Sequence, residues 1–241
     1  MKIPKKISPD NLKDTVIQIL FNPGVAPELV LGAFNFGLSD TFKFVASLPA
    51  KKGIKVSAND GIFLESIQKG YFLDMKELVK VDITSNSISF NTFKDYIGWD
   101  SYLPVISNTL TKLFEIGLIK EINRIGIRYI SQFDNTNLFE NLNMTLSIDV
   151  PNKVFEATQV RSEFSDNNYK VIMTLINKIK NTENNKEINT SIIDIDVIQL
   201  FDNLKEAKTA INAIEEGHQK QKHTFFTLLK PAFLETLNPE Y

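Results

Sequence analysis

Strand patterns follow one another in consecutive runs along this chain, and a long helical pattern follows each run. Apolar and β-branched residues form the segments 14–22, 78–84 and 87–91, which turn-forming residues separate. Strands that succeed one another across tight turns pair antiparallel, and the helices that follow them pack against the sheet. The order therefore predicts an α+β fold and argues against a doubly wound parallel sheet.

Two stretches of the first half carry less regular strand patterns. "LVLGAFNFGL" (29–38) predicts a strand with a glycine inside it. "GIFLESIQKGYFLDMK" (61–76) predicts two strands that meet in a hairpin near Lys69-Gly70. Together with the two segments that follow, residues 60–91 are expected to form an antiparallel meander.

A helix is predicted after this meander. Asp100 or Ser101 can cap its start, and Gly117 is a natural stop. Between them, apolar residues recur every three or four positions and form one buried stripe: Leu103, Ile106, Leu110 and Leu113. A strand over 122–131 follows directly.

The second half repeats this order of strands and then a helix. Four strands are predicted, over 144–150, 156–165, 169–179 and 191–201. "SDNN" (165–168) has the composition of a hairpin turn, and the asparagine-rich segment 180–190 is expected to be a solvated, mobile loop. A long helix is predicted from 203 to about 230, where Pro231 should kink or end it. Its apolar stripe has near-heptad spacing: Leu204, Ala207, Ile211, Ile214, His218, Phe225, Leu228 and Ala232.

These patterns predict a single α+β unit over residues 1–241, made of two antiparallel meanders that are each followed by a long helix. The halves cover about 12–133 and 140–237. One interpretation of the repeated order is an ancient duplication, although no residue-level repeat accompanies it.

Composition excludes several kinds of site. The chain has no cysteine, which excludes thiol catalysis, disulfides and cysteine metal sites, and its two histidines are too few for a three-histidine site. The 27 basic and 29 acidic residues give a net charge of −2, which disfavours non-specific nucleic-acid binding. No segment reaches the run of about 18 apolar residues that a membrane helix needs. We expect a cytoplasmic protein that does not bind a membrane.

Three strand patterns carry charged residues at every second position, which places each pair on one face of its strand. The pairs are Arg124 and Arg128, Arg161 and Glu163, and Asp194 and Asp196. One interpretation is a pocket that binds a small anion or a phosphate, because the planar guanidinium grips such groups at two points. The other is a cross-strand network of ion pairs.

Two further residue types could carry chemistry. Asp194 and Asp196 are candidate ligands for a hard cation, although pairs at this spacing are common and we predict no metal and no cofactor. His218 lies on the apolar stripe of the long helix, where it is either a base or a partly buried histidine with one hydrogen bond. His223 lies off that stripe and is expected to be exposed.

Several stretches in a fixed order resemble a sporadically distributed bacterial family of uncharacterised proteins of about this length. The stretches are "GIFLESIQKGYFLDM", "WDSYLPV", "INRIGIRYISQF", "SIIDIDV" and "HQKQKHTFFTLL". The matching positions are Gln68, Trp99, Arg124, Arg128, Tyr129, Asp194, Asp196, His218 and Phe226. The resemblance implies one continuous structural unit, and it brings no activity, cofactor or catalytic residue.

The function predicted from the sequence is a non-enzymatic protein-interaction or assembly module that binds itself, as a homodimer, or another protein. Its support is the lack of nucleophile, metal and phosphate-loop motifs. The alternative is a phosphate- or nucleotide-binding enzyme or sensor. In that alternative Arg124, Arg128 and Arg161 bind the anion, and Asp194 and Asp196 bind a divalent cation.

Overall fold

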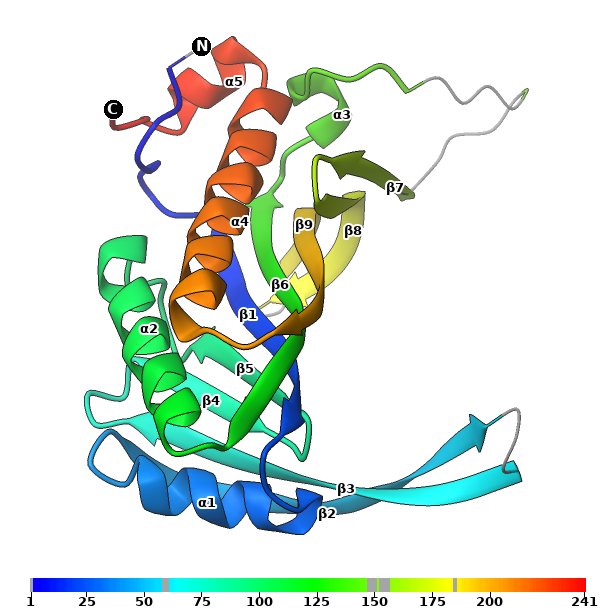
Figure 1. Ribbon diagram of the computed structural model, residues 1–241. Helices are drawn as coiled ribbons and strands as arrows, with labels where there is room; N and C mark the ends of the chain where they lie inside the picture. Colours follow the sequence, from blue (N-terminus) through cyan, green and yellow to red (C-terminus); the bar gives the residue numbers. More distant parts are fainter. Residues whose placement is uncertain (1, 58–60, 147–150, 152–156, 184–185) are drawn as a thin grey trace. The chain divides into compact units, whose positions relative to one another are not determined.

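A computed structural model describes residues 2–57, 61–146, 151, 157–183 and 186–241. Within these residues nine strands form one antiparallel sheet, in the order β2-β3-β4-β5-β1-β6-β9-β8-β7, and a long helix lies near the C-terminus (Figure 1). The fold is therefore α+β, as the order of the sequence patterns predicts.

The strands account for most of the regular structure. They are β1 (Leu12–Pro23), β2 (Phe42–Ser57), β3 (Gly61–Asp74), β4 (Val79–Ile83), β5 (Ser87–Thr92), β6 (Ile119–Asp134), β7 (Thr158–Asp166), β8 (Tyr169–Glu183) and β9 (Lys186–Leu204). The helices are η1 (Pro27–Leu29), α1 (Val30–Gly37), α2 (Trp99–Glu115), α3 (Leu138–Asn141), α4 (Ala207–Leu228) and α5 (Pro231–Thr236).

The chain divides into two compact units, neither of which is continuous in sequence. Unit 1 contains Met1–Thr15, Ile127–Gln199 and Glu216–Tyr241, and unit 2 contains Val16–Gly126 and Leu200–Glu215. Each unit takes segments from both halves of the sequence, because β1, β6, β9 and α4 each pass from one unit to the other. The predicted halves are thus not the compact units, and a single unit over the whole chain stays a prediction.

In unit 2 the meander β3-β4-β5 is confirmed, and β1 pairs with β5. Alternate residues of these strands are buried, among them Ile17, Ile19, Val81, Ile83, Ile88 and Phe90. Helices α1 and α2 contact each other and supply Phe34, Ile106, Leu110 and Leu113 to the buried side. The period-2 pattern of the strands therefore buries one face of the sheet under helices.

The predicted strand over 29–38 is wrong, because α1 occupies this segment. Its buried residues, Val30 and Phe34, are four positions apart, which is helical spacing. Pro27 opens the preceding turn of η1, a position where the missing N–H costs nothing.

The predicted hairpin at Lys69-Gly70 is also wrong, because β3 runs unbroken through these residues. Gly70 lies under α1, and a Cβ at this position would be 2.1 Å from Leu31 Cδ1. The glycine permits close approach of the helix to the strand and marks no turn.

Helix α2 is confirmed, but the predicted caps at its start, Asp100 or Ser101, are wrong. It begins at Trp99 after Gly98, whose φ is 80°, and no side chain caps it. Its buried residues include Ile106, Leu110 and Leu113 of the predicted stripe. Gly117 follows the helix with φ of 68°, as expected for a stop.

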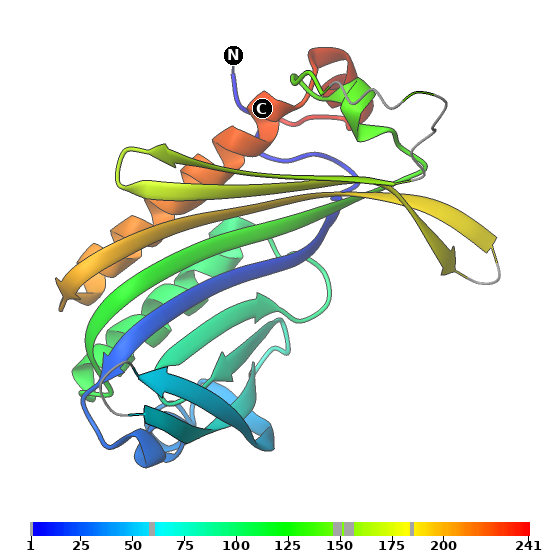
Figure 2. The ribbon, with the colours of Figure 1, turned by 90° about the vertical axis from the view of Figure 1, so that its right-hand side faces the viewer.

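In unit 1 the strands β7, β8 and β9 form a second meander, and α4 packs against one face of the strands (Figures 1 and 2). The buried cluster includes Phe133, Val171, Leu175, Ile193, Ile195, Val197, Phe225 and Leu229. A Cβ on Gly217 would be 2.5 Å from Ile127 Cδ1, so this glycine brings α4 close to β6. The two-residue turn after Asp166 is the predicted "SDNN" turn, and Asn167 there has φ of 53°.

Three predictions for the second half need correction or fall outside the structure. Of the strand predicted over 144–150, residues 144–146 are not a strand, and 147–150 lie outside the described residues. Of the predicted loop over 180–190, residues 180–183 and 186–190 belong to paired strands, with pairs from Lys180↔Asn189 to Glu183↔Lys186, and 184–185 lie outside the described residues (Figure 2). Backbone pairing there continues past the apolar part of the strands, which a hydrophobic pattern does not register. The long helix ends at Leu228, and Pro231 begins α5.

Candidate functional site

Arg128 and Asp194 form a two-point ion pair on neighbouring strands of unit 1. Arg128 Nε donates to Asp194 Oδ1 at 2.9 Å, and Nη2 donates to Oδ2 at 2.6 Å. This hydrogen bonding raises the pKa of Arg128, and the charges of Asp194, Asp196 and Asp14 add to the increase. The guanidinium fork is thus engaged by a carboxylate of the protein itself, as the ion-pair interpretation requires.

Arg161 belongs to a second charged cluster, on the β7–β8 hairpin. It contacts Glu163 on its own strand, and Lys170 on β8 contacts the other oxygen of the same carboxylate. Hydrogen bonds from Lys170 and then Arg161 lower the pKa of Glu163. Arg161 pairs with Thr174 on β8, and Thr174 pairs with Asp194 on β9. Arg161 and Asp194 therefore lie on the same face of the sheet, with β8 between their strands.

Arg124 lies in unit 2, where Nη1 donates to Gln18 Oε1 at 2.7 Å. Its guanidinium lies over Gly126, so that a Cβ on this glycine would be 3.0 Å from Nη2 and 3.3 Å from Cζ. The glycine between the two arginines therefore provides space for the first of them.

His218 is a residue of α4 and faces the opposite side of the strands. Its Nδ1 is 3.1 Å from the hydroxyl of Tyr129, the residue that follows Arg128 and points the other way. Burial, aided by the charge of Lys222, lowers the pKa of His218 to about 3. The imidazole is therefore neutral near pH 7, which supports a buried histidine with a hydrogen bond more than a base. His223 is exposed, as predicted.

The predicted site residues are thus distributed over several places. Arg128, Asp194 and Asp196 interact on one face of unit 1, and Arg161 and Glu163 form their own cluster on the same face. His218 lies on the opposite face of these strands, and Arg124 belongs to unit 2. An anion site at Arg128 would have to displace Asp194, and that alternative stays a prediction.

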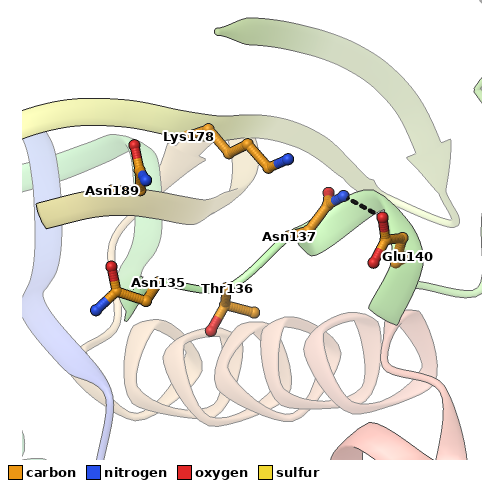
Figure 3. Close-up of a pocket in the computed structure, with 6 residues that line it drawn as sticks. All are labelled: Asn135, Thr136, Asn137, Glu140, Lys178 and Asn189. Carbon is orange, nitrogen blue, oxygen red and sulfur yellow. Dashed lines mark hydrogen bonds between the residues drawn. The ribbon is translucent and has the colours of Figure 1, made fainter. Parts of the chain in front are cut away.

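A pocket of about 270 Å³ in unit 1 has none of these residues in its lining (Figure 3). It is lined by Asn135, Thr136, Asn137, Glu140, Lys178 and Asn189. These residues come from the turn between β6 and α3, from α3 itself, from the middle of β8 and from the start of β9. In Figure 3 the ammonium end of Lys178 is directed toward the α3 side of the pocket, where Asn137 donates a hydrogen bond to Glu140.

A network of buried polar groups fixes the wall of this pocket. Asn177 Oδ1 accepts from the backbone N–H of Leu138 at 2.8 Å, and its Nδ2 donates to Asn137 Oδ1 at 2.9 Å. Ser191, which is fully buried, donates to the carbonyl of Thr136 at 2.7 Å. Buried polar groups with these partners hold their neighbours in one arrangement.

The backbone around the pocket is unusual at two residues. Asn135 and Lys178 have φ of 51° and 59°, in the left-handed region. Asparagine tolerates this region, whereas lysine there costs roughly 1–2 kcal/mol. Lys178 lies in an irregularity of β8, where the register with β9 shifts between Ile176 and Ile179. Such irregularities are common beside binding sites.

Sequence reasoning missed this pocket. The signal was the density of asparagines in 135–143 and 177–189, of which we interpreted 180–190 as a loop. The residues that line the pocket are far apart in the chain, and strand pairing alone brings them together.

The edge strand β2 of unit 2 presents a different surface. Phe44, Val45 and Leu48 are apolar side chains that lie about half exposed on it. On the neighbouring α1, Phe36 is 89% exposed. Apolar groups that gather at a sheet edge are typical of interaction surfaces.

The described part of the chain has neither a cluster of metal ligands nor a membrane helix. No three His, Asp or Glu side chains there are grouped so that they could hold a metal ion. No helix there has the length and apolar character that crossing a membrane requires.

A comparison with protein-family models finds no match, and a comparison with curated proteins finds none either. The resemblance to a bacterial family therefore stays a prediction.

Proposed function

We propose that the protein is a non-enzymatic interaction module that accepts an extended segment of another protein as an additional strand beside β2. The observation that carries the proposal is the position of β2, a strand of sixteen residues at one end of the sheet order. A terminal strand has backbone N–H and C=O groups along one side that no strand of the sheet pairs, and peptides bind to such edges by strand addition.

The side chains of β2 favour binding over protection of the edge. Protected edges are short or carry charge along their whole length. Here Phe44, Val45 and Leu48 are exposed within the first seven residues, and Val45 lies where the register with β3 shifts. Pro49 follows, and since proline lacks the N–H that a ladder needs, we place the binding segment at 42–48.

The charge of β2 indicates an acidic partner. Within the binding segment the charged residue is Lys43, which also contacts Glu77 of unit 2, and the rest of the strand sequence adds Lys51, Lys52 and Lys55 and no acidic residue. A second copy of β2 would add further lysines and no carboxylate to pair with them. An extended segment that alternates apolar and acidic residues matches both the charge and the apolar side chains.

Fluorescence anisotropy with labelled model peptides tests the proposal. We expect a peptide of alternating valine and glutamate to bind more tightly than one of alternating valine and lysine. Val45→Ser and Leu48→Ser should weaken this binding. Leu200→Ser is the matched control, because Leu200 is 73% exposed and lies outside β2.

Hydrogen exchange locates the peptide. Amides of residues 43–48 should exchange more slowly when the valine–glutamate peptide is bound. Equal affinity for both peptides, or equal effects of all three substitutions, would contradict strand addition at β2. A dimer that Val45→Ser dissociates would show that a second copy is the occupant.

A further inference from the structure

We propose that the pocket between α3 and the irregularity of β8 binds a small zwitterion of the amino-acid class. Lys178 would hold the carboxylate of the ligand, and Glu140 would hold its ammonium group. This site lies in unit 1 and does not depend on the surface at β2.

Opposite charges line this pocket without neutralising each other. Lys178 makes no ion pair within the described residues, and Glu140 makes none there either. The one recorded partner of the Glu140 carboxylate is the neutral amide of Asn137, which donates to Oε1. A ligand with one charge of each sign can pair with both groups at once, whereas an anion or a cation pairs with one and is repelled by the other.

The remaining lining is suited to the polar parts of such a ligand. Asn135 and Asn189 are joined through their backbones, since the N–H of Asn135 donates to the carbonyl of Asn189 at 2.6 Å. Both side chains are exposed, and each amide offers donors and an acceptor. None of the six described lining residues is apolar, so the chemistry of the pocket favours a small polar molecule over an aromatic one.

The size and stiffness of the pocket fit a small metabolite. Its volume of about 270 Å³ lies just below the range for drug-sized ligands. The wall is held by the buried Asn177 and Ser191, whose hydrogen bonds join β8, β9 and the turn into α3. A site formed this way exists before the ligand arrives, which reduces the ordering that binding requires.

The backbone conformation of Lys178 also supports a functional role for its side chain. Its φ of 59° suits glycine or asparagine better than lysine. A residue that is unfavourable for its backbone conformation is expected at a position where the function requires its side chain. The exposed ammonium is the feature of this residue that glycine and asparagine lack.

Isothermal titration calorimetry with the full chain tests the proposal. The probes are glycine, L-alanine, L-serine, L-glutamate and L-lysine, with propionate and propylamine as single-charge analogues of alanine. We expect at least one amino acid to bind and both analogues to bind at least about tenfold more weakly, because each loses one ion pair.

Two substitutions assign the charges. Lys178→Asn removes the ammonium and keeps a residue that accepts the left-handed conformation, and Glu140→Gln keeps an oxygen that can accept from Asn137. Each should weaken amino-acid binding at least about tenfold. Lys208→Gln and Glu235→Gln change the same charges at exposed positions away from the pocket and should leave binding unchanged.

Three results would overturn the proposal. The first is that no amino acid binds at millimolar concentration. The second is that propionate binds as well as alanine and that Glu140→Gln has no effect, which indicates a simple anion site. The third is that the control substitutions weaken binding as much as those in the pocket.

Discussion

Arg128 on β6 and Asp194 on β9 share two hydrogen bonds across neighbouring strands, and the two side chains are exposed to different extents. The side chain of Arg128 is 47% exposed and that of Asp194 is 16% exposed. Asp194 therefore depends more on the ion pair than Arg128 does. Without the guanidinium, its carboxylate would carry a negative charge that water solvates poorly.

A double-mutant cycle measures this pair. We expect Arg128→Ala and Asp194→Ala to be coupled by about 0.5–1 kcal/mol in urea unfolding, because the arginine is too exposed for a larger contribution. High salt should reduce the coupling. The more exposed pair of Arg161 and Glu163 should give a smaller value, and a coupling of zero at low salt would show that Arg128 does not stabilise the sheet.

His218 should make the stability of the protein depend on pH. The folded pKa of about 3 lies below the value near 6.5 expected in the unfolded chain, so the unfolded state binds more protons between these pH values. The contribution is complete above about pH 6.5 and decreases as the pH falls toward 3, by at most about 1.4 kcal/mol per pH unit.

Urea unfolding between about pH 5 and 7 tests this dependence, since most carboxylates remain ionised in that window. His218→Gln should flatten the decrease and keep a polar group near Tyr129. His223→Gln should leave the decrease in stability at low pH as it is in the wild type, because that histidine is exposed. A wild-type slope that His218→Gln does not change would refute the low pKa of His218.

Glycines in two helices should respond in opposite ways to alanine. Gly217→Ala places a Cβ 2.5 Å from Ile127 Cδ1 in the core, which should destabilise the protein by about 1–2 kcal/mol despite the higher helix propensity of alanine. Gly32→Ala on α1 meets no atom within 4 Å and should stabilise it by about 0.5–1 kcal/mol. Thermal unfolding of both variants gives the comparison, and destabilisation by Gly32→Ala would contradict the open surroundings of that residue.

Lys178→Gly should stabilise the fold while it weakens the proposed amino-acid site. Glycine adopts φ of 59° without steric cost, and the expected gain in free energy of unfolding is about 0.5–1 kcal/mol. Lys170→Gly is the contrast, because Lys170 lies in the regular part of β8 and glycine there should destabilise the strand. If Lys178→Gly lowers stability as well, the left-handed backbone is not a source of strain.

Periodicity predicted those parts of the fold in which one face of an element is apolar. It identified β1, β4, β5, β6 and β7, the core of β8 and β9, and both long helices. In each of these elements the buried residues recur with the period of a strand or of a helix. It failed at 29–38, where apolar residues occupy nearly every position and both repeats fit. It also failed at Gly70, because a glycine that admits a packed helix and one that makes a turn look alike in a sequence.

The candidate sites could also be predicted only in part. The charged faces of β6, β7 and β9 could be predicted, because residues two apart on a strand point together. Which charges pair depends on the strand order: β6 is beside β9 and β7 is at the edge, and neither follows from the residues themselves. The pocket depends further on a register shift in β8 and on a turn more than thirty residues away, so no local pattern marks it.

The interrupted sequence of the two units has a consequence for synthesis. A nascent chain that has left the ribosome as far as Gln199 still lacks Leu200–Glu215 of unit 2 and Glu216–Tyr241 of unit 1. Both units must therefore remain incomplete, with apolar faces uncovered, until these segments have been synthesised, and chaperones have that interval in which to bind. The single tryptophan can report when it ends, because Trp99 Nε1 donates to Glu215 Oε2 at 2.6 Å, and its fluorescence should change only when the last segment of unit 2 has docked.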